Sequence, residues 1–330
     1  MSSLRMNLPR EFLATTLLPA VCLLAAFFVP TTFFAQHFTK QTHAYKVFED
    51  LRIQLDAYQL TQKKKAPAIL WIHGGALIFG HRGMINRAQL DRYLQSGFVV
   101  FSIDYRLAPE TKLPLILKDL EDAYGWIRAE GSKIYGIDPN RIAVVGHSGG
   151  GYLTLASGYR LHPRPRALVA FYGYGDITSA WYSRPDPHYL KETPVSPETV
   201  EAAIRKRPLA ESLKEEERWP IYLFYRQRGL WPREVAGIDP EREPAEFIPF
   251  SPLNNVSPDY PPTLLLHGDK DSDVPFEQSE KMDRELNRQK IPHEFIRVPG
   301  GEHGFDGAMQ DPKVKSIFER VLTFLSQQTK

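Results

Sequence analysis

Residues 142–156 read IAVVGHSGGGYLTLA: an apolar run, then Gly-His-Ser-Gly-Gly at 146–150, then a helix-compatible segment. A Gly-x-Ser-x-Gly pattern between a strand and a helix predicts a sharp, strained turn that holds Ser148 out toward a substrate. The outer glycines are needed because the neighbouring chain leaves no room for a β-carbon. Taken alone, the motif also fits a glycine-rich loop without catalysis.

A second glycine-rich segment, His-Gly-Gly-Ala at 73–76, follows another apolar run. Small residues at the end of a strand allow backbone N–H groups to converge on one point, as an oxyanion hole requires. We expect Gly74 and Gly75 to form this hole together with Gly149, which opens the helix after the serine turn. A plain glycine turn is the alternative, and His73 is expected to be structural rather than a base.

Two loops nearer the C-terminus supply the other candidates for catalysis. One follows an apolar strand and carries three carboxylates, Asp269, Asp271 and Asp273, of which one should orient a histidine. The other is rich in glycine, follows the last expected strand and carries His303, which can therefore reach the serine. The chain order serine, aspartate, histidine is that of α/β-hydrolases and differs from the chymotrypsin and subtilisin orders.

Short apolar runs alternate with longer amphipathic segments from residue 68 onward. This alternation predicts an α/β protein with a doubly wound, mostly parallel sheet of eight strands. The sheet is expected to open with an antiparallel pair within residues 46–60. The other expected strands are 68–72, 99–103, 142–145, 167–171, 263–267 and 295–298, and the expected helices are 84–96, 113–131, one after Gly149, 275–288 and 312–327.

The alternation of strands and helices is interrupted between residues 176 and 258. This segment of roughly 80 residues is far longer than an ordinary connection. This segment is rich in proline, tryptophan and tyrosine, and helices are expected at 197–205 and 209–227. We interpret it as a cap inserted over the active site. A surface excursion without function is the alternative, and the cap aromatics fit a pocket lining and an ordinary cap core equally well.

The composition is that of an ordinary globular protein, with 42% hydrophobic and 24% charged residues in a chain of 330. A formal charge of +2 and the lack of a basic stripe give no indication of a nucleic-acid partner. Cys22 is the only cysteine, so neither an intrachain disulfide nor a thiolate metal cluster can form.

The N-terminus has the character of a targeting segment. Arg5 and Arg10 precede an almost uncharged apolar run at 12–36, so residues 1–36 are expected to be a signal peptide or a membrane anchor. The protein would then be exported, as a secreted or periplasmic protein, or held at a membrane, and the intact mass of the mature chain separates these alternatives. The expected catalytic domain spans residues 45–330, with the cap insertion at about 176–258.

On these motifs, the sequence resembles the hormone-sensitive-lipase-like and feruloyl-esterase-like branches of the α/β-hydrolase fold. The resemblance covers residues 66–325 except for the cap. It implies that the acid is Asp271, because its spacing from the preceding His-Gly pair matches the acid loop of the family, and that Asp269 and Asp273 are solvated turn or helix-capping residues. The marks of the resemblance are HGG at 73–75, DYRLAPE at 104–110, the Ser148 turn, the Asp271 loop and His303.

Members of these branches are mostly carboxylesterases, with some amidases and formamidases, and they need no metal or organic cofactor. The expected reaction is therefore attack of Ser148 on a small-molecule carboxylic ester, with His303 as base and Asp271 as the orienting acid. An amidase or peptidase with the same residues is the nearest alternative, and an interfacial lipase or a non-catalytic binding protein are further ones. Two departures, Ala76 in place of a third glycine and His-Ser-Gly at 147–149 in place of Asp-Ser-Ala, leave the subfamily open.

Overall fold

A computed structural model describes residues 38–60 and 64–330 of the chain. The expected signal peptide or anchor at 1–36, and Cys22 within it, lie outside these residues. In the part of the chain that the structure describes, no helix combines the length and the apolar character needed to cross a membrane.

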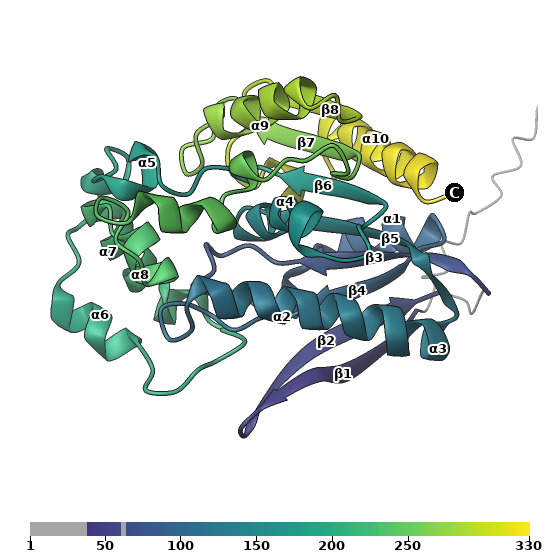
Figure 1. The fold of residues 1–330 in the computed structure, drawn as a ribbon, viewed down its shortest axis with the longest axis horizontal. Coiled ribbons are helices and arrows are strands. Elements are labelled where there is room, and N and C mark those ends of the chain that lie inside the picture. The colour runs from purple at the N-terminus through teal and green to yellow at the C-terminus, as the bar shows by residue number, and fades with distance from the viewer. Residues whose placement is uncertain (1–37, 61–63) are drawn as a thin grey trace, which may run out of the picture. The chain divides into compact units, whose positions relative to one another are not determined.

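The described chain is built on one eight-stranded sheet with the strand order β1-β2-β4-β3-β5-β6-β7-β8 (Figure 1). β1 pairs antiparallel with β2, and β2 pairs antiparallel with β4, whereas all the remaining neighbours are parallel. The strands are β1 (Thr39–Phe48), β2 (Leu51–Gln59), β3 (Ala66–Ile72), β4 (Val99–Ile103), β5 (Ile137–His147), β6 (Ala167–Phe171), β7 (Thr263–Gly268) and β8 (His293–Val298).

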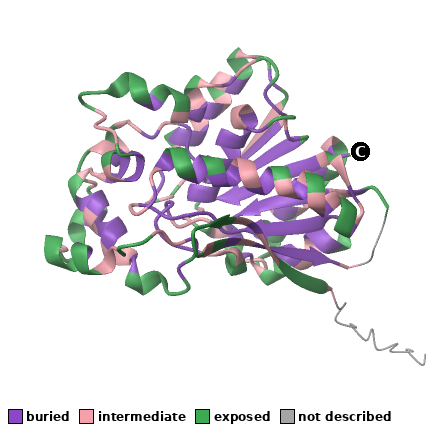
Figure 2. Cartoon of the chain, turned by 60° about the horizontal axis from the view of Figure 1, so that its bottom comes forward, coloured by how far each residue is buried: buried purple, intermediate pink, exposed green. Residues whose placement is uncertain are grey.

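Helices cover both faces of this sheet, and each face has its own apolar core. On one face, α1 (Arg87–Gln95) and α10 (Pro312–Gln328) pack on alternate strand residues such as Ile69 and Trp71. On the other face, α2 (Leu113–Trp126), α4 (Gly149–Arg160) and α9 (Glu277–Arg288) pack on the intervening residues. The strands β4, β6 and β7 are buried along their whole length, and the interior of the sheet is largely buried (Figure 2), as expected for parallel strands between two helix layers.

The predicted α/β fold with eight strands is confirmed, and the strand predicted at 167–171 coincides with β6. The opening pair begins earlier than expected, at Thr39 rather than within 46–60. Most of β1 is exposed because it is an edge strand, so its first residues show no apolar alternation that sequence analysis could detect.

The segment between β6 and β7 contains α5 (Ala180–Ser183), α6 (Pro197–Ala203), α7 (Trp219–Arg228) and α8 (Trp231–Ala236). We call residues 176–258 the cap segment. The prediction of a helix at 209–227 was wrong for the first half of this range. There Ser212 donates its backbone N–H to Gly80 O in an isolated β-bridge. α7 begins only at Trp219, where Pro220 occupies a first-turn position that suits proline.

A buried ion pair ties the opening strand and the loop after β4 to α2. Asp119 on α2 is completely buried and accepts hydrogen bonds from Arg106 Nε and Nη2, each at 2.7 Å. Lys46 Nζ on β1 lies 2.7 Å from the same carboxylate.

We expect Asp119→Ala to lower the free energy of unfolding by about 3–5 kcal/mol, because it leaves the buried Arg106 guanidinium without its counter-charge. Asp122→Ala, on the same helix but partly exposed, serves as the matched control and should change it by no more than about 1 kcal/mol. Denaturant titration measures both. Equal losses in the two variants would contradict this account.

Candidate active site

Ser148 occupies a strained turn between β5 and α4. Its backbone has φ 55° and ψ −117°, a conformation that residues with a side chain rarely adopt. The flanking glycines make this turn sterically feasible: a β-carbon on Gly146 would lie 2.2 Å from Gly150 O, and one on Gly150 would lie 2.3 Å from Ile72 O. The predicted arrangement of strand, sharp turn and helix is therefore present.

The His-Gly-Gly-Ala segment lies directly beside this turn. A β-carbon on Gly74 would lie 3.3 Å from Ser148 Cβ, and one on Gly149 would lie 3.0 Å from the backbone nitrogen of Ala76. Gly74, Gly75 and Ala76 line the same cavity as Ser148. The structure thus brings the residues predicted for the oxyanion hole close to the serine. His73 is buried, and its Nδ1 lies 2.8 Å from Gly74 O, as a structural histidine would.

This segment continues into a strained loop that the cap segment holds. Ala76 and Leu77 both have positive φ, 52° and 65°, which is unfavourable for residues other than glycine. The indole Nε1 of Trp231 donates to Ala76 O at 3.0 Å, and Nε of the buried Arg218 donates to Ile78 O at 2.6 Å. Two cap side chains therefore fix the carbonyl groups of a loop whose backbone nitrogens at Ala76 and Leu77 lie close to Gly149.

His303 and Asp271 form a hydrogen-bonded pair. Nδ1 of His303 lies 2.8 Å from Oδ2 of Asp271, whose side chain is fully buried. The other carboxylate oxygen accepts the backbone N–H groups of Asp273 and Val274. Burial alone would raise the pKa of the Asp271 carboxyl, but hydrogen bonds from His267 and His303 outweigh it and hold the pKa well below its usual range.

Close backbone contact holds the two loops of this pair together. A β-carbon on Gly268 would lie 2.1 Å from Gly301 O, so only glycine allows the two chains to approach. The backbone N–H of Lys270 donates to the same Gly301 oxygen at 3.0 Å. These contacts fix the distance between the strand end that carries Asp271 and the loop that carries His303.

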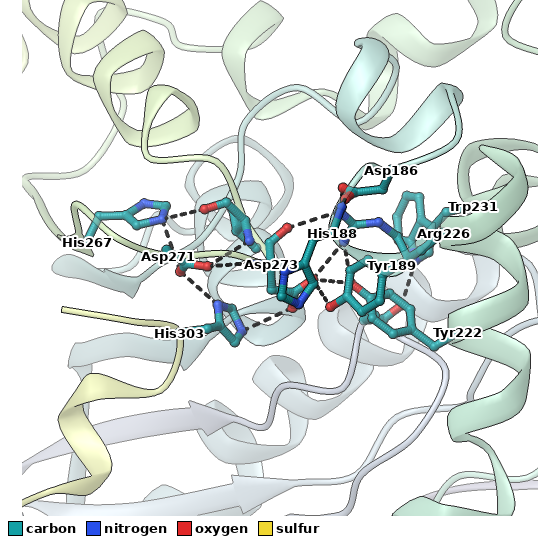
Figure 3. Close-up of polar contacts among 12 residues, drawn as sticks. Asp186, His188, Tyr189, Tyr222, Arg226, Trp231, His267, Asp271, Asp273 and His303 are labelled. Carbon is teal, nitrogen blue, oxygen red and sulfur yellow. Dashed lines mark hydrogen bonds and ion pairs between the residues drawn. The ribbon is translucent and has the colours of Figure 1, made fainter. Parts of the chain in front are cut away.

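The prediction that Asp273 is a solvated turn or helix-capping residue was wrong. Its Oδ2 lies 3.4 Å from Nε2 of His303, and its Oδ1 accepts hydrogen bonds from Tyr189, Tyr222 and Arg226 of the cap segment (Figure 3). No sequence motif indicated this cluster, because Arg226 lies 47 residues away on a helix with no matching pattern.

A buried carboxylate that the sequence analysis missed is Asp306, three residues beyond His303. It accepts hydrogen bonds from Tyr172 at the end of β6, at 2.5 Å, and from Gln89 on α1, at 2.6 Å. Its Oδ2 also lies 3.0 Å from Nε2 of His147, the residue before the serine. Burial works against ionisation, but these partners lower the pKa of Asp306 to about 2. Asp306 therefore ties the His303 loop to the serine strand.

Ser148 and His303 open onto one cavity with a volume of 510 Å³, within the range of small-molecule sites. No hydrogen bond joins the two side chains in the described part of the chain. Among the described residues, no group of three or more His, Cys, Asp or Glu side chains is arranged to hold a metal ion. The aromatic residues of the cavity wall are Trp71, Phe79, Tyr172, Tyr189, Trp219 and Tyr222.

The strand order, the strained serine turn and the His-Gly-Gly segment beside it define an α/β-hydrolase. The chain belongs to the BD-FAE family, whose model matches residues 55–286. This match confirms the resemblance to the feruloyl-esterase-like branch that the motifs indicated.

Among known proteins, the chain is similar to the esterase LipC of Mycobacterium tuberculosis, with 31% identity over 266 residues that cover 77% of this chain and 57% of LipC. An α/β hydrolase superfamily protein from Enterococcus faecalis has a TM-score of 0.67 and 24% identity, covering 89% of this chain and all of that one. The butyrate-bound Est2 esterase of Thermogutta terrifontis has a TM-score of 0.62 and 20% identity, covering 87% and 94%. The chain spans about half the length, or less, of the curated relatives it matches.

We expect Gly150→Ala to lower the free energy of unfolding by about 1–3 kcal/mol, because its β-carbon meets backbone oxygens of β3 that cannot move away. Gly125→Ala is the matched control: it lies in α2 with no atom within 4 Å of the added carbon, and should stabilise by about 0.5–1 kcal/mol. Denaturant titration of both variants checks the difference. The same sign of change in both would refute the steric argument.

Proposed function

We propose that the chain is a carboxylic ester hydrolase that acts through an acyl-enzyme on Ser148. The observation that carries this proposal is the shared cavity of Ser148 and His303, with the latter's Nδ1 held at 2.8 Å by the buried Asp271 carboxylate. Membership in the BD-FAE family and similarity to an esterase support it.

In the proposed reaction, Nε2 of His303 removes the proton of Ser148 as the serine oxygen attacks the ester carbonyl. Asp271 holds the proton of the neutral imidazole on Nδ1, so the lone pair is on Nε2, and the carboxylate stabilises the imidazolium that forms. For this step the imidazole turns its Nε2 toward the serine, because the two side chains are not hydrogen-bonded in the described structure.

The negative oxygen of the tetrahedral intermediate would be stabilised by the backbone N–H groups of Gly74, Gly75 and Gly149. The N-terminus of α4 begins at Gly149 and adds a favourable helix dipole. The imidazolium then returns its proton to the leaving alcohol, and a water molecule repeats the sequence to release the acid. Loss of one such donor typically costs about 3 kcal/mol of activation free energy.

The test is hydrolysis of a matched panel of short-chain, long-chain and aromatic esters and anilides by the full chain and by Ser148→Ala. We expect ester turnover in the wild type and a drop of at least about 10³-fold in the variant, because the nucleophile is gone. Labelling with a serine-reactive fluorophosphonate should likewise vanish in Ser148→Ala. A preference for anilides would indicate an amidase. A wild type that hydrolyses none of these substrates and does not react with the fluorophosphonate would refute the proposal.

The charge of the cavity limits which esters fit. The ionisable side chains that line it are the carboxylates Glu215, Asp273 and Asp306 and the imidazoles His147 and His303, with no lysine or arginine among its lining residues in the described ranges. An anionic substrate would therefore lose hydration without meeting a lysine or arginine in the cavity wall.

We accordingly expect neutral esters to be hydrolysed with at least about 10-fold higher kcat/KM than anionic ones of the same size, a difference of about 1.4 kcal/mol. Steady-state kinetics on an aryl methyl succinate and the matching aryl hemisuccinate measure this ratio, since the two differ only in the free carboxylate. Equal rates for the pair would show that the carboxylates of the wall do not select the substrate.

A further inference from the structure

Asp273 is a carboxylate with its two oxygens in different surroundings. Oδ1 accepts hydrogen bonds from the hydroxyl of Tyr189 at 2.8 Å, from Nη1 of Arg226 at 2.7 Å and from the hydroxyl of Tyr222. Oδ2 faces Nε2 of His303 at 3.4 Å. The cap segment thus holds one oxygen and leaves the other directed at the imidazole (Figure 3).

The cluster around Asp273 places charged side chains in the protein interior, where they lose hydration. Arg226 is fully buried, forms a second ion pair with Asp186, and also donates from Nη2 to Asp273 O at 3.1 Å. Buried ion pairs contribute little net stability compared with apolar side chains of the same size, because both charges lose their hydration. The cluster is therefore better explained by what Asp273 does to His303 than by stability.

Nε2 of His303 has two competing partners. It is the atom that takes the proton of Ser148 in the proposed reaction, yet in this structure it faces Asp273. With the Nδ1 proton held by Asp271, a neutral imidazole presents a lone pair at Nε2, which a carboxylate repels. An imidazolium presents an N–H there, which the carboxylate attracts.

We propose that Asp273, held by the cap segment, is a positioning residue for His303 that retains the protonated imidazole away from Ser148 and releases the neutral imidazole to it. This inference rests on the proposed function, in which His303 is the base. Its consequence is that the cap cluster sets the lower pH limit of ester hydrolysis.

The charged groups that face His303 agree with this role. They are Asp271 and Asp273 from the loop after β7 and Asp306 from the turn that follows His303. The uncharged ring of Tyr172 packs against the imidazole, with the two ring centroids 4.5 Å apart. Burial disfavours the charged imidazole, but the three carboxylates outweigh it and raise the pKa of His303 above its usual range. Because the base must be neutral, activity is lost as the pH falls through this raised pKa.

The direct test is an NMR titration of ¹⁵N-labelled histidine in the full chain, with the His303 signal assigned by its absence in His303→Gln. We expect Asp273→Asn to lower the pKa of His303 by about 1, the smaller end of the range for a close opposite charge, because Arg226 already offsets part of that charge. Asp269→Asn is the matched control, since this carboxylate in the same loop pairs with Arg297 and should leave the titration unchanged.

The same change should appear in the pH dependence of kcat/KM for a neutral ester. We expect the acidic limb of Asp273→Asn to move about 1 pH unit lower. Tyr222→Phe removes one cap contact but keeps the charge, so it should not lower the pKa of His303. If Tyr222→Phe lowered it as much as Asp273→Asn, the effect would come from loosening the cap and the proposal would be wrong.

These outcomes remain separable from the proposed function. If the wild type turned over no ester, the hydrolase proposal would fail, while the NMR titration would still measure the effect of Asp273 on His303. If Asp273→Asn did not fold, the wild-type titration could still refute the inference. A His303 pKa at or below about 6.5 beside an intact Asp273 would overturn the inference.

Discussion

The strained turn at Ser148 is the constraint on which the site depends. A backbone φ of 55° at a serine persists only where the surrounding chain fixes it, and here that chain is the end of β3 on one side and the first turn of α4 on the other. The approach is so close that β-carbons are excluded at both flanking glycines. The same approach places the His-Gly-Gly segment, which continues β3, beside the serine. One steric requirement therefore positions two parts of the site.

The cap segment acts on this arrangement mainly through polar side chains. Trp231 and Arg218 hold carbonyl groups of the strained loop after β3, and Arg226 holds Asp273 beside His303. Three cap aromatics also form part of the cavity wall, namely Tyr189, Trp219 and Tyr222. Because these contacts reach both the loop beside the serine and the imidazole, a change in cap position would alter the geometry of both at once.

The sequence predicted those features whose cause is local. Apolar runs between turn residues located the strands of the parallel sheet. The glycine pattern located the Ser148 turn, because a turn that sterically requires glycine has glycine at fixed positions in the sequence. The loops that carry Asp271 and His303 were located from the apolar strands before them, and the choice of Asp271 came from the resemblance to the acid loop of the family. Features that depend on distant partners were missed. The first residues of β1 are exposed, and the ion pair of Asp273 depends on Arg226, which no local pattern relates to it.

An imidazole between two carboxylates raises the question of which group carries the proton. Burial disfavours the charged form of Asp273, yet His303 and Arg226 outweigh it and lower the pKa of that carboxyl, while the pKa of His303 is raised. The two shifts run in opposite directions, so a proton on Nε2 stays on the imidazole and Asp273 does not compete as a base. The three donors at Oδ1 draw charge away from Oδ2, which limits its attraction for the imidazolium. Asp273 can therefore hold the protonated imidazole in the resting enzyme without preventing the proton on Nε2 from passing to a leaving alcohol during catalysis.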